Sequence, residues 1–311
     1  MSRYWSLERP VGLDLGKLEV YSFRRRPYPL FTKEVALEIL SAAESGLGEV
    51  EVSLDLWRSR ETVALSKSGV EVRGAAVPLD ALREILDDDR SVYALVSGAL
   101  EKLEVRADHF YKLVKSGPGH APTLEIDGIH MHRVKGIHPE EDARLKVMKA
   151  SRKLKDSVVL DICTGLGYTA SSALELGASF ILTVEKDVNV LKLAELNPWS
   201  WVLESEKVVV INDDASSLIF ELPSNFFEVA IHDPPRLALA GELYSREFYG
   251  EVFRVLRRGG TLVHYVGRPG ERFRGIRLYR GVAERLRRLG FKVSVDKRLG
   301  VVVGEKLGGS P

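Results

Sequence analysis

Two patterns of hydrophobic and polar positions divide the chain. From Val158 onward, short runs of Val, Ile and Leu alternate with amphipathic segments, which is typical of α/β folds. The runs are expected to be strands at 158–162, 180–185, 208–212, 229–232, 261–266, 291–296 and 300–305, and the intervening segments to be helices at about 169–176, 187–196, 216–221, 245–255 and 281–289. This predicts a doubly wound, Rossmann-like, seven-stranded and mostly parallel sheet with an antiparallel edge.

The first 115 residues favour a smaller α+β accessory domain. Alternation predicts an antiparallel meander, followed by further helices and strands: strands at 50–56, 62–65, 70–73 and 103–114, and helices at about 33–43, 79–86 and 91–100. A linker and β-hairpin are expected over 116–139, with Asp127-Gly128 as a type I′ turn. The remaining domain, 140–311, opens on a helix that starts at Pro139 and carries basic residues such as Lys146 toward its end.

Composition adds constraints on class and compartment. The chain has 311 residues, 45% of them hydrophobic, which is enough for a sizeable core. No apolar run approaches the ~18 residues of a membrane-spanning helix, and the first ten residues lack the apolar stretch of a secretory signal. A single cysteine, Cys163, fits a reducing cytoplasm. The absence of Gln, with only four Asn and 29% charged residues, is typical of thermophile proteins, although codon bias in a GC-rich genome gives the same trend.

The net charge of +1 hides an uneven distribution. From Arg236 to the end there are 17 Lys+Arg and 7 Asp+Glu, a net +10, so the preceding residues carry −9. Much of the excess lies in the segment GRPGERFRGIRLYR after the expected fifth strand, which contains Arg268, Arg272 and Arg274. Such a segment with interleaved aromatics can contact RNA phosphates and bases. The alternative is a solvated surface whose arginines pair with acids elsewhere.

Candidate ligand-binding residues stand where the expected parallel strands end. Asp161 is followed by the glycine turn Gly165-Leu166-Gly167, and Glu185 ends the next strand, where a carboxylate can accept two ribose hydroxyls. Asp214, after the third strand, can accept an adenine amino group or cap the following helix. Taken alone, Gly-x-Gly-x-x-Ala also fits an NAD site.

The fourth strand ends in Asp233-Pro234-Pro235-Arg236. Two consecutive prolines remove two N–H donors and stiffen the backbone, which either terminates the strand or presents neighbouring acceptors to a ligand.

Together these motifs resemble those of class I S-adenosylmethionine-dependent methyltransferases, over roughly 140–305. The segments DICTGLGYTA, VEKDVNVLKLAELNPWS and HDPPRLALAGELYSREFY are similar to a predicted archaeal methyltransferase family with a DPPR motif and an N-terminal β-rich extension, and the likeness reaches back to IDGIHMHR. The resemblance implies an S-adenosylmethionine cofactor and methylation of RNA, at cytidine N4 first and guanosine N2 second, in rRNA rather than tRNA.

The resemblance also implies roles for individual residues. The residues expected to bind the cofactor are Asp161, Thr164, Gly165, Gly167, Tyr168, Glu185, Lys186, Asp214 and Ala215. Those expected to carry catalysis are Asp233, Pro234, Pro235 and Arg236, and those expected to bind substrate are His132, Arg133, Tyr244, Tyr265, Arg268, Arg272 and Arg274. The Asp233 carboxylate and Pro234 carbonyl would accept the two hydrogens of an exocyclic amine. No Cys/His cluster suggests a metal.

One position departs from the amino-methyltransferase pattern, because an aromatic usually follows the two prolines and Arg236 stands there instead. A guanidinium can stack on a base or bind a phosphate. Alternatively, Tyr244, Phe248 or Tyr249 supplies the ring and Arg236 pairs with an acid.

Four rival functions remain open at this stage. They are an NAD-dependent oxidoreductase, an aminopropyltransferase acting on polyamines, a methyltransferase acting on protein or small amines, and an RNA-binding protein on a degenerate methyltransferase scaffold. The sequence does not determine the oligomeric state.

Overall fold

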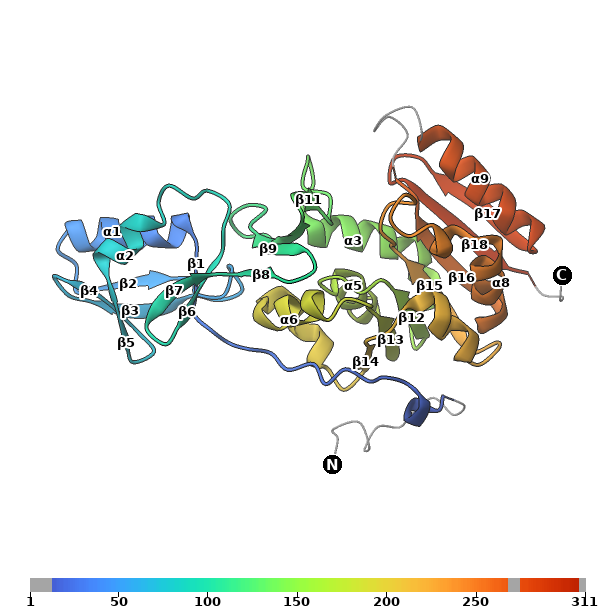
Figure 1. Cartoon of the computed structure of the whole chain (residues 1–311), viewed down its shortest axis with the longest axis horizontal. Coiled ribbons are helices and arrows are strands. Elements are labelled where there is room, and N and C mark those ends of the chain that lie inside the picture. The colour runs from blue at the N-terminus through green and yellow to red at the C-terminus, as the bar shows by residue number, and fades with distance from the viewer. Residues whose placement is uncertain (1–12, 268–274, 308–311) are drawn as a thin grey trace. The chain divides into compact units, whose positions relative to one another are not determined.

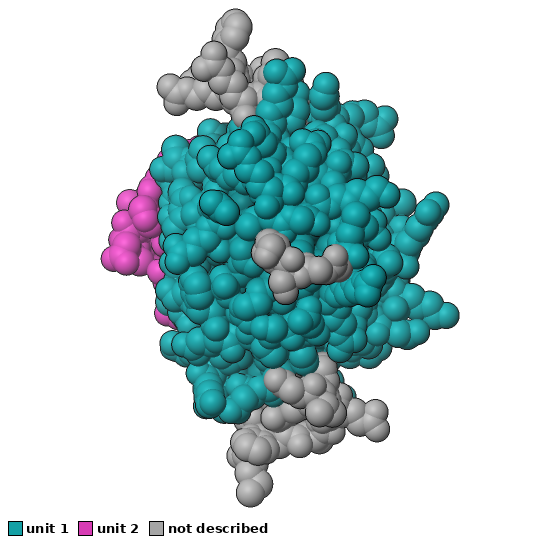
Figure 2. Space-filling model, turned by 90° about the vertical axis from the view of Figure 1, so that its right-hand side faces the viewer, with its two compact units in different colours: residues 1–23, 141–188, 202–311 teal, residues 24–140, 189–201 magenta. Residues whose placement is uncertain are grey.

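The computed structural model describes residues 13–267 and 275–307 and groups the chain into two compact units (Figures 1 and 2). Unit 1 contains the described parts of 1–23, 141–188 and 202–311, and unit 2 contains 24–140 and 189–201. The segment 116–139 therefore groups with the first half of the chain, whereas residues 13–23 group with the second half.

Unit 1 is built on a seven-stranded sheet with the order β14-β13-β12-β15-β16-β18-β17. The first five strands in this order are parallel, and β18 runs antiparallel to both of its neighbours, β16 and β17. The strands are β12 (Val158–Ile162), β13 (Phe180–Val184), β14 (Val208–Ile211), β15 (Phe227–His232), β16 (Leu256–Tyr265), β17 (Phe291–Asp296) and β18 (Val301–Lys306). The expected fold class is confirmed, including the antiparallel edge.

Helices precede the first strand of this sheet and connect its strands along the chain. They are α3 (Pro139–Val147), η3 (Met148–Ala150), α4 (Ser151–Leu154), α5 (Tyr168–Glu175), α6 (Val188–Leu196), η4 (Pro198–Glu204), α7 (Ala215–Leu218), η5 (Ile219–Glu221), η6 (Gly241–Tyr244), α8 (Arg246–Val255) and α9 (Gly275–Arg288), with η2 (Leu15–Lys17) before the sheet. Within the described residues, none of these helices is long and apolar enough to cross a membrane.

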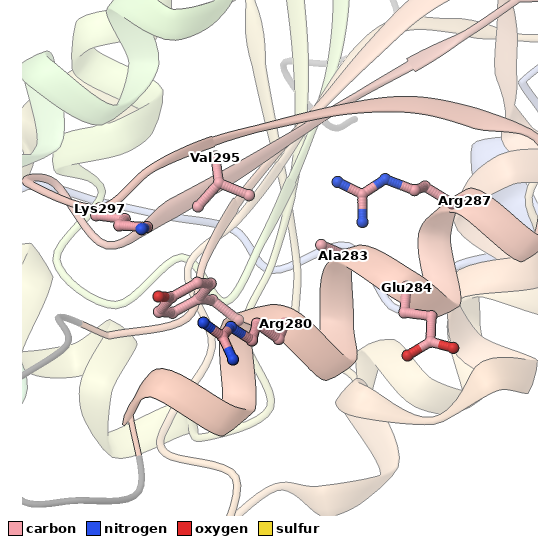
Figure 3. A pocket seen from close by; sticks show the side chains of 7 residues that line it. Arg280, Ala283, Glu284, Arg287, Val295 and Lys297 are labelled. Carbon is pink, nitrogen blue, oxygen red and sulfur yellow. The ribbon is translucent and has the colours of Figure 1, made fainter.

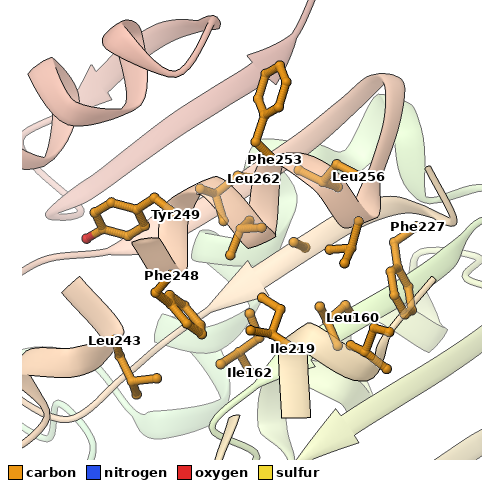
Figure 4. Packing of buried hydrophobic residues seen from close by; sticks show 14 of the residues in the cluster. Leu160, Ile162, Ile219, Phe227, Leu243, Phe248, Tyr249, Phe253, Leu256 and Leu262 are labelled. Atoms are coloured by element: carbon orange, nitrogen blue, oxygen red, sulfur yellow. The ribbon is translucent and has the colours of Figure 1, made fainter. Parts of the chain in front are cut away.

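One face of the sheet packs against α7, α8 and α9 (Figure 4). Leu160, Ile162 and Leu262 of the strands belong to one buried cluster with Phe248 and Tyr249 of α8, and all five side chains are buried. Alternate positions of the same strands are also buried because parallel strands are covered on both faces. The edge strand β14 is covered by the N-terminal segment, where the Tyr21 amide donates to the Val210 carbonyl.

Unit 2 holds three small antiparallel sheets, the helices α1 and α2, and most of α6. The sheets have the orders β1-β6-β7, β2-β3-β4-β5 and β11-β10-β9-β8. The elements are β1 (Leu30–Phe31), α1 (Lys33–Glu44), β2 (Glu49–Val52), β3 (Glu61–Leu65), β4 (Gly69–Val72), β5 (Ala75–Pro78), α2 (Leu79–Glu84), β6 (Tyr93–Val96), β7 (Ala99–Lys102), β8 (Glu104–Arg106), β9 (Phe110–Val114), β10 (Thr123–Ile126) and β11 (Ile129–His130). The hairpin around Asp127-Gly128 is confirmed, and both turn residues have positive φ.

The helix expected at 91–100 is wrong. This segment forms the hairpin of β6 and β7, which turns at Ser97-Gly98, where both residues have positive φ. Tyr93 and Leu95 are buried, and so is Ala94 between them. An apolar run buried on both faces shows no period of two and is easily mistaken for a helix.

Lys306 supports the C-terminal end of α8 from inside unit 1. Its side chain is buried, and its ammonium donates to the carbonyls of Phe253 and Leu256, at 2.7 and 2.6 Å, and to Asn225 Oδ1 at 2.9 Å. The last carbonyls of a helix lack partners within the helix, so this cation satisfies them.

We expect Lys306→Met to lower the free energy of unfolding by roughly 2–4 kcal/mol, because the buried acceptors lose a charged donor. Denaturant unfolding measures this loss. Lys292→Met, at an exposed position on the neighbouring strand β17, is the control and should leave the stability nearly unchanged. Equal stability of the two variants would contradict the supporting role of Lys306.

Candidate active site

The carboxyl ends of four neighbouring strands bring the polar candidate residues to one edge of the sheet. Ile162 at the end of β12 lies in register with Val184 of β13 and with His232 of β15. Residues following these strands are therefore adjacent, and the Asp233 amide donates to the Ile162 carbonyl at 3.3 Å. The chain order reverses at β12, because β13 and β14 lie on one side of it and β15 and β16 on the other. Ligands bind at such switch points in open α/β sheets.

The turn after β12 has an unusual backbone. Cys163, Gly165 and Gly167 all have positive φ, at 71°, 53° and 76°. The Cys163 and Thr164 amides both donate to the Val184 carbonyl at 3.0 Å, which holds the turn against the end of β13. A left-handed residue other than glycine costs free energy and is often found at a functional site. A Cβ on Gly167 would lie 2.8 Å from the Leu203 side chain, so this position requires glycine.

Asp161 is fully buried beneath this turn. Its Oδ2 accepts from the Thr183 hydroxyl at 2.7 Å, whereas Oδ1 accepts no hydrogen bond from any described residue. Burial raises the pKa of Asp161 to about 7. A buried carboxyl oxygen without a donor is costly, and it is suited to receive a donor from a ligand.

Glu185 and Asp214 both stabilise local backbone. Glu185 accepts the Gly165 amide at 3.0 Å and the Asp187 amide at 3.1 Å, and burial raises its pKa. Asp214 Oδ1 accepts the amide and the hydroxyl of Ser216 at 2.8 and 2.7 Å, so the helix-capping alternative is confirmed. Each ionised carboxylate has further lone pairs, so capping does not prevent either group from accepting a ligand hydrogen bond.

Asp233 forms an ion pair with a buried lysine. Lys146 Nζ lies 2.7 Å from Asp233 Oδ2, 2.9 Å from Asp142 Oδ2 and 3.7 Å from the ring centroid of Tyr265. The Lys146 side chain is 8% exposed and that of Asp233 is 25% exposed. Burial alone would lower the pKa of Lys146, but the carboxylates of Asp233 and Asp142 outweigh it and the pKa is raised. The ammonium therefore stays charged beside Asp233.

Lys146 is the site residue that the sequence reasoning did not identify. In the sequence it is one of several basic residues toward the end of an amphipathic helix, where a charged residue is usually solvated. The spacing Asp142-x-x-x-Lys146 was the available signal, but i,i+4 charge pairs also occur on exposed helix faces. The burial of this pair is visible only in the folded chain.

The Tyr244 side chain supports the Asp233-Pro234-Pro235 segment. The Tyr244 hydroxyl donates to the Pro235 carbonyl at 2.9 Å, and Tyr244 is only 3% exposed. Tyr244, Phe248 and Tyr249 are all buried in the core, so none of the three offers a ring to a base, contrary to one alternative for the missing aromatic. Arg236 is exposed, as are the three residues after it.

Two stacked histidines lie under the same segment. The rings of His232 and His264 have centroids 4.2 Å apart, and His264 Nε2 is 3.0 Å from the Tyr249 hydroxyl. Burial lowers the pKa of His232 and lowers that of His264 to about 4. Both rings are therefore neutral core groups near pH 7, which agrees with a structural role for His264.

The remaining expected site residues divide into three groups. Thr164 and Tyr168 are buried next to the glycine turn, Ala215 is half-buried and Lys186 is exposed. His132 and Arg133 belong to unit 2, and their role in substrate binding stays a prediction. Arg268, Arg272 and Arg274 lie outside the described residues. In the part of the chain that is described, no three His, Cys, Asp or Glu side chains are grouped to hold a metal ion.

The raised pKa of Asp161 predicts a pH dependence of stability. Between its ordinary pKa of 3.8 and about 7, the folded state holds a proton that the unfolded state releases. The free energy of unfolding therefore falls by about 4 kcal/mol in total as the pH rises through this window. We expect Asp161→Asn to abolish this part of the pH dependence in denaturant unfolding. Asp156→Asn, an exposed carboxyl, is the control, and parallel curves for the two variants would contradict the assignment.

No protein-family model matches the chain. A spermidine synthase in complex with the transition-state analogue AdoDATO has a TM-score of 0.54 and 18% identity, covering 67% of this chain and 73% of that one. Spermidine synthase from Thermotoga maritima has a TM-score of 0.52 and 17% identity, covering 66% and 72%. At these identities the similarity shows the fold alone.

Two similarities are visible in sequence. Polyamine aminopropyltransferase of Mycobacterium tuberculosis is 35% identical over 121 residues, which are 36% of this chain and 23% of that protein. The uncharacterized protein MJ1233 of Methanocaldococcus jannaschii is 42% identical over 277 residues, which are 87% of this chain and 93% of that protein. The chain therefore belongs to the same family as MJ1233.

Proposed function

We propose that the protein transfers a methyl group from S-adenosylmethionine to an exocyclic amine of an RNA base. Cytidine N4 is the first candidate and guanosine N2 the second, in rRNA rather than tRNA. The doubly wound sheet supports the proposal, as does the arrangement of Asp161, Glu185, Asp214 and Asp233 at the carboxyl ends of four successive parallel strands.

The residues at the sheet edge fit the cofactor. The unpartnered buried Oδ1 of Asp161 suits an ammonium or hydroxyl donor, and the glycine turn lets a ligand approach the backbone closely. Glu185 would bind the ribose hydroxyls, and Asp214 would accept the adenine amino group. When bound, S-adenosylmethionine supplies a methyl group on a cationic sulfur that is already activated for transfer.

The observation that carries the choice of substrate is the ion pair between Lys146 and Asp233. A second cation bound at Asp233 would lie close to a buried ammonium, which is unfavourable in a poorly solvated site. A neutral exocyclic amine meets no such repulsion. The geometry thus favours a neutral aromatic amine over an ammonium group.

Asp233 and Pro234 would orient that amine. The lone pair of an exocyclic amine is conjugated with the base, so the nitrogen is a poor nucleophile until its hydrogens are bound by acceptors. Lys146 engages Asp233 Oδ2, so Oδ1 is the oxygen we assign to one N–H, and the Pro234 carbonyl would accept the other. Asp233 would then take up the proton that the methylated nitrogen releases. Positioning and electrostatics supply most of the rate enhancement in such a reaction.

A second candidate is aminopropyl transfer to a polyamine, which the similarities to spermidine synthase and to polyamine aminopropyltransferase favour. A polyamine is cationic near pH 7, so its binding requires carboxylates that are not already neutralised. Asp233 and Asp142 share the charge of Lys146, which weakens this candidate.

Replacement of Asp233 with Asn keeps the side-chain shape but removes the acceptor charge. We expect methyl transfer from labelled S-adenosylmethionine to unmodified RNA to fall by at least about 100-fold. Calorimetric titration of the cofactor should be nearly unchanged, which also shows that the variant is folded. Glu242→Gln, exposed in η6, is the control. An active Asp233→Asn enzyme would rule out the mechanism.

A set of parallel reactions separates the candidate activities. We expect methyl label to enter RNA, and we expect no product from decarboxylated S-adenosylmethionine with putrescine or spermidine. NAD should not bind in calorimetry. Mass spectrometry of nucleosides from a deletion strain should show the loss of a methylated cytidine. An aminopropylated product, or an unchanged RNA profile, would instead favour a polyamine, protein or small-amine substrate.

A further inference from the structure

A basic groove lies between α9 and β17 in unit 1. A cavity of about 380 Å³ is lined by Arg280, Ala283, Glu284 and Arg287 of α9, with Tyr279 beside them, and by Val295 and Lys297 across from the helix (Figure 3). A second hollow of about 480 Å³ shares Val295 and Lys297 with the first, so the two adjoin. We call the combined depression the α9–β17 groove.

Three of the cations that line this groove are not neutralised within the described residues, whereas a fourth, Lys149, is paired with Asp296 in the second hollow. Arg280 and Arg287 are exposed, and neither forms an ion pair with a described carboxylate. The acid on the same wall, Glu284, is paired with Arg288. Lys297 lies 6.0 Å from the ring of Tyr279, a contact that leaves its charge uncompensated. Three positive charges are therefore available to an anion.

The spacing of these charges suits an extended polyanion. Arg280 and Arg287 are seven residues apart on α9, so they lie on one face of the helix at about 10 Å along its axis. Lys297 stands on the opposite wall. A single small anion cannot engage charges that far apart, whereas successive phosphates of a nucleic-acid strand can.

The groove is connected to the edge of the sheet that carries Asp233. Lys297 begins the turn between β17 and β18, and the Val266 amide at the end of β16 donates to Gly300 of that turn at 2.8 Å. Lys149, three residues after Lys146, forms an ion pair with Asp296 at 2.6 Å.

A second connection runs through α9. Arg285 Nη1 donates to the Tyr244 carbonyl at 2.8 Å, and the Tyr244 hydroxyl donates to Pro235 at 2.9 Å. A strand bound in the groove would thus lie on elements that directly contact the candidate active site.

We propose that the α9–β17 groove binds the phosphate backbone of the RNA substrate, with Arg280, Arg287 and Lys297 as phosphate contacts. This inference rests on the proposed function in taking RNA as the substrate. Phosphate contacts position a nucleic acid without reading its sequence. The groove would therefore strengthen binding of RNA generally, while base selection takes place at Asp233.

The test is the variant Arg280→Ala/Arg287→Ala/Lys297→Ala, with RNA binding measured by fluorescence anisotropy on a labelled 20-nucleotide single-stranded RNA. We expect affinity at 0.1 M salt to fall roughly 10- to 100-fold, and the slope of log affinity against log salt to decrease by about 2, since each lost phosphate contact removes about 0.7. In methyl-transfer assays, KM for RNA should rise while kcat and cofactor binding are retained.

The matched control is Lys207→Ala/Arg258→Ala/Lys292→Ala, which removes three exposed cations near the amino-terminal end of the parallel strands. It should bind RNA nearly as well as the wild type.

If RNA affinity falls equally in the two triple variants, the loss reflects net charge alone and the groove is not the binding site. If the groove variant binds RNA as well as the wild type, the groove proposal is wrong, but the proposed methyl-transfer function is not contradicted. If the wild-type protein binds no RNA, both the groove proposal and the RNA substrate are wrong. If the Asp233→Asn variant binds RNA and still transfers methyl groups, only the catalytic role of Asp233 is contradicted.

Discussion

The arrangement of the candidate active site depends on one buried ammonium group. Lys146 lies between the carboxylates of Asp142 and Asp233 and against the ring of Tyr265. It joins the helix that opens unit 1 to the ends of β15 and β16. Removal of either partner from a buried ion pair leaves an uncompensated charge. Lys146 thus fixes one oxygen of Asp233 and places a positive charge beside the position that we assign to the incoming amine.

The basic excess of the C-terminal region is partly structural. Arg254 donates to the carbonyls of Ile219 and Leu222, Arg285 donates to the Tyr244 carbonyl, and Lys306 is buried at the end of α8. These cations satisfy backbone acceptors and are not available to a ligand. Fewer positive charges are therefore available to a partner than the count of basic residues suggests. Among the described residues of this region, Arg280, Arg287 and Lys297 line the α9–β17 groove.

The second half of the fold was predictable because its hydrophobic runs, helical segments and turn residues all indicate the same alternation of strands and helices. The strands β12, β13 and β14 are short apolar runs, and helices fill the segments between them. Asp161, Glu185, Asp214 and Asp233 were found for the same reason, since carboxyl ends of parallel strands converge. In the first half, the run around Tyr93 and Leu95 failed as a helix prediction, because two-sided burial removes the alternation that marks a strand.

The doubly wound sheet, its antiparallel edge and the acidic residues at its carboxyl ends are predictable from the sequence, because they follow from short-range periodicity and from the geometry of parallel strands. The folded chain is needed to show that Lys146 is buried against Asp233, that Phe248 and Tyr249 lie in the core, and that Asp161 keeps an unpartnered oxygen. It also shows which arginines are engaged by carbonyls and which line the α9–β17 groove. These features depend on contacts between residues far apart in the chain, whose burial and charge pairing no local pattern encodes.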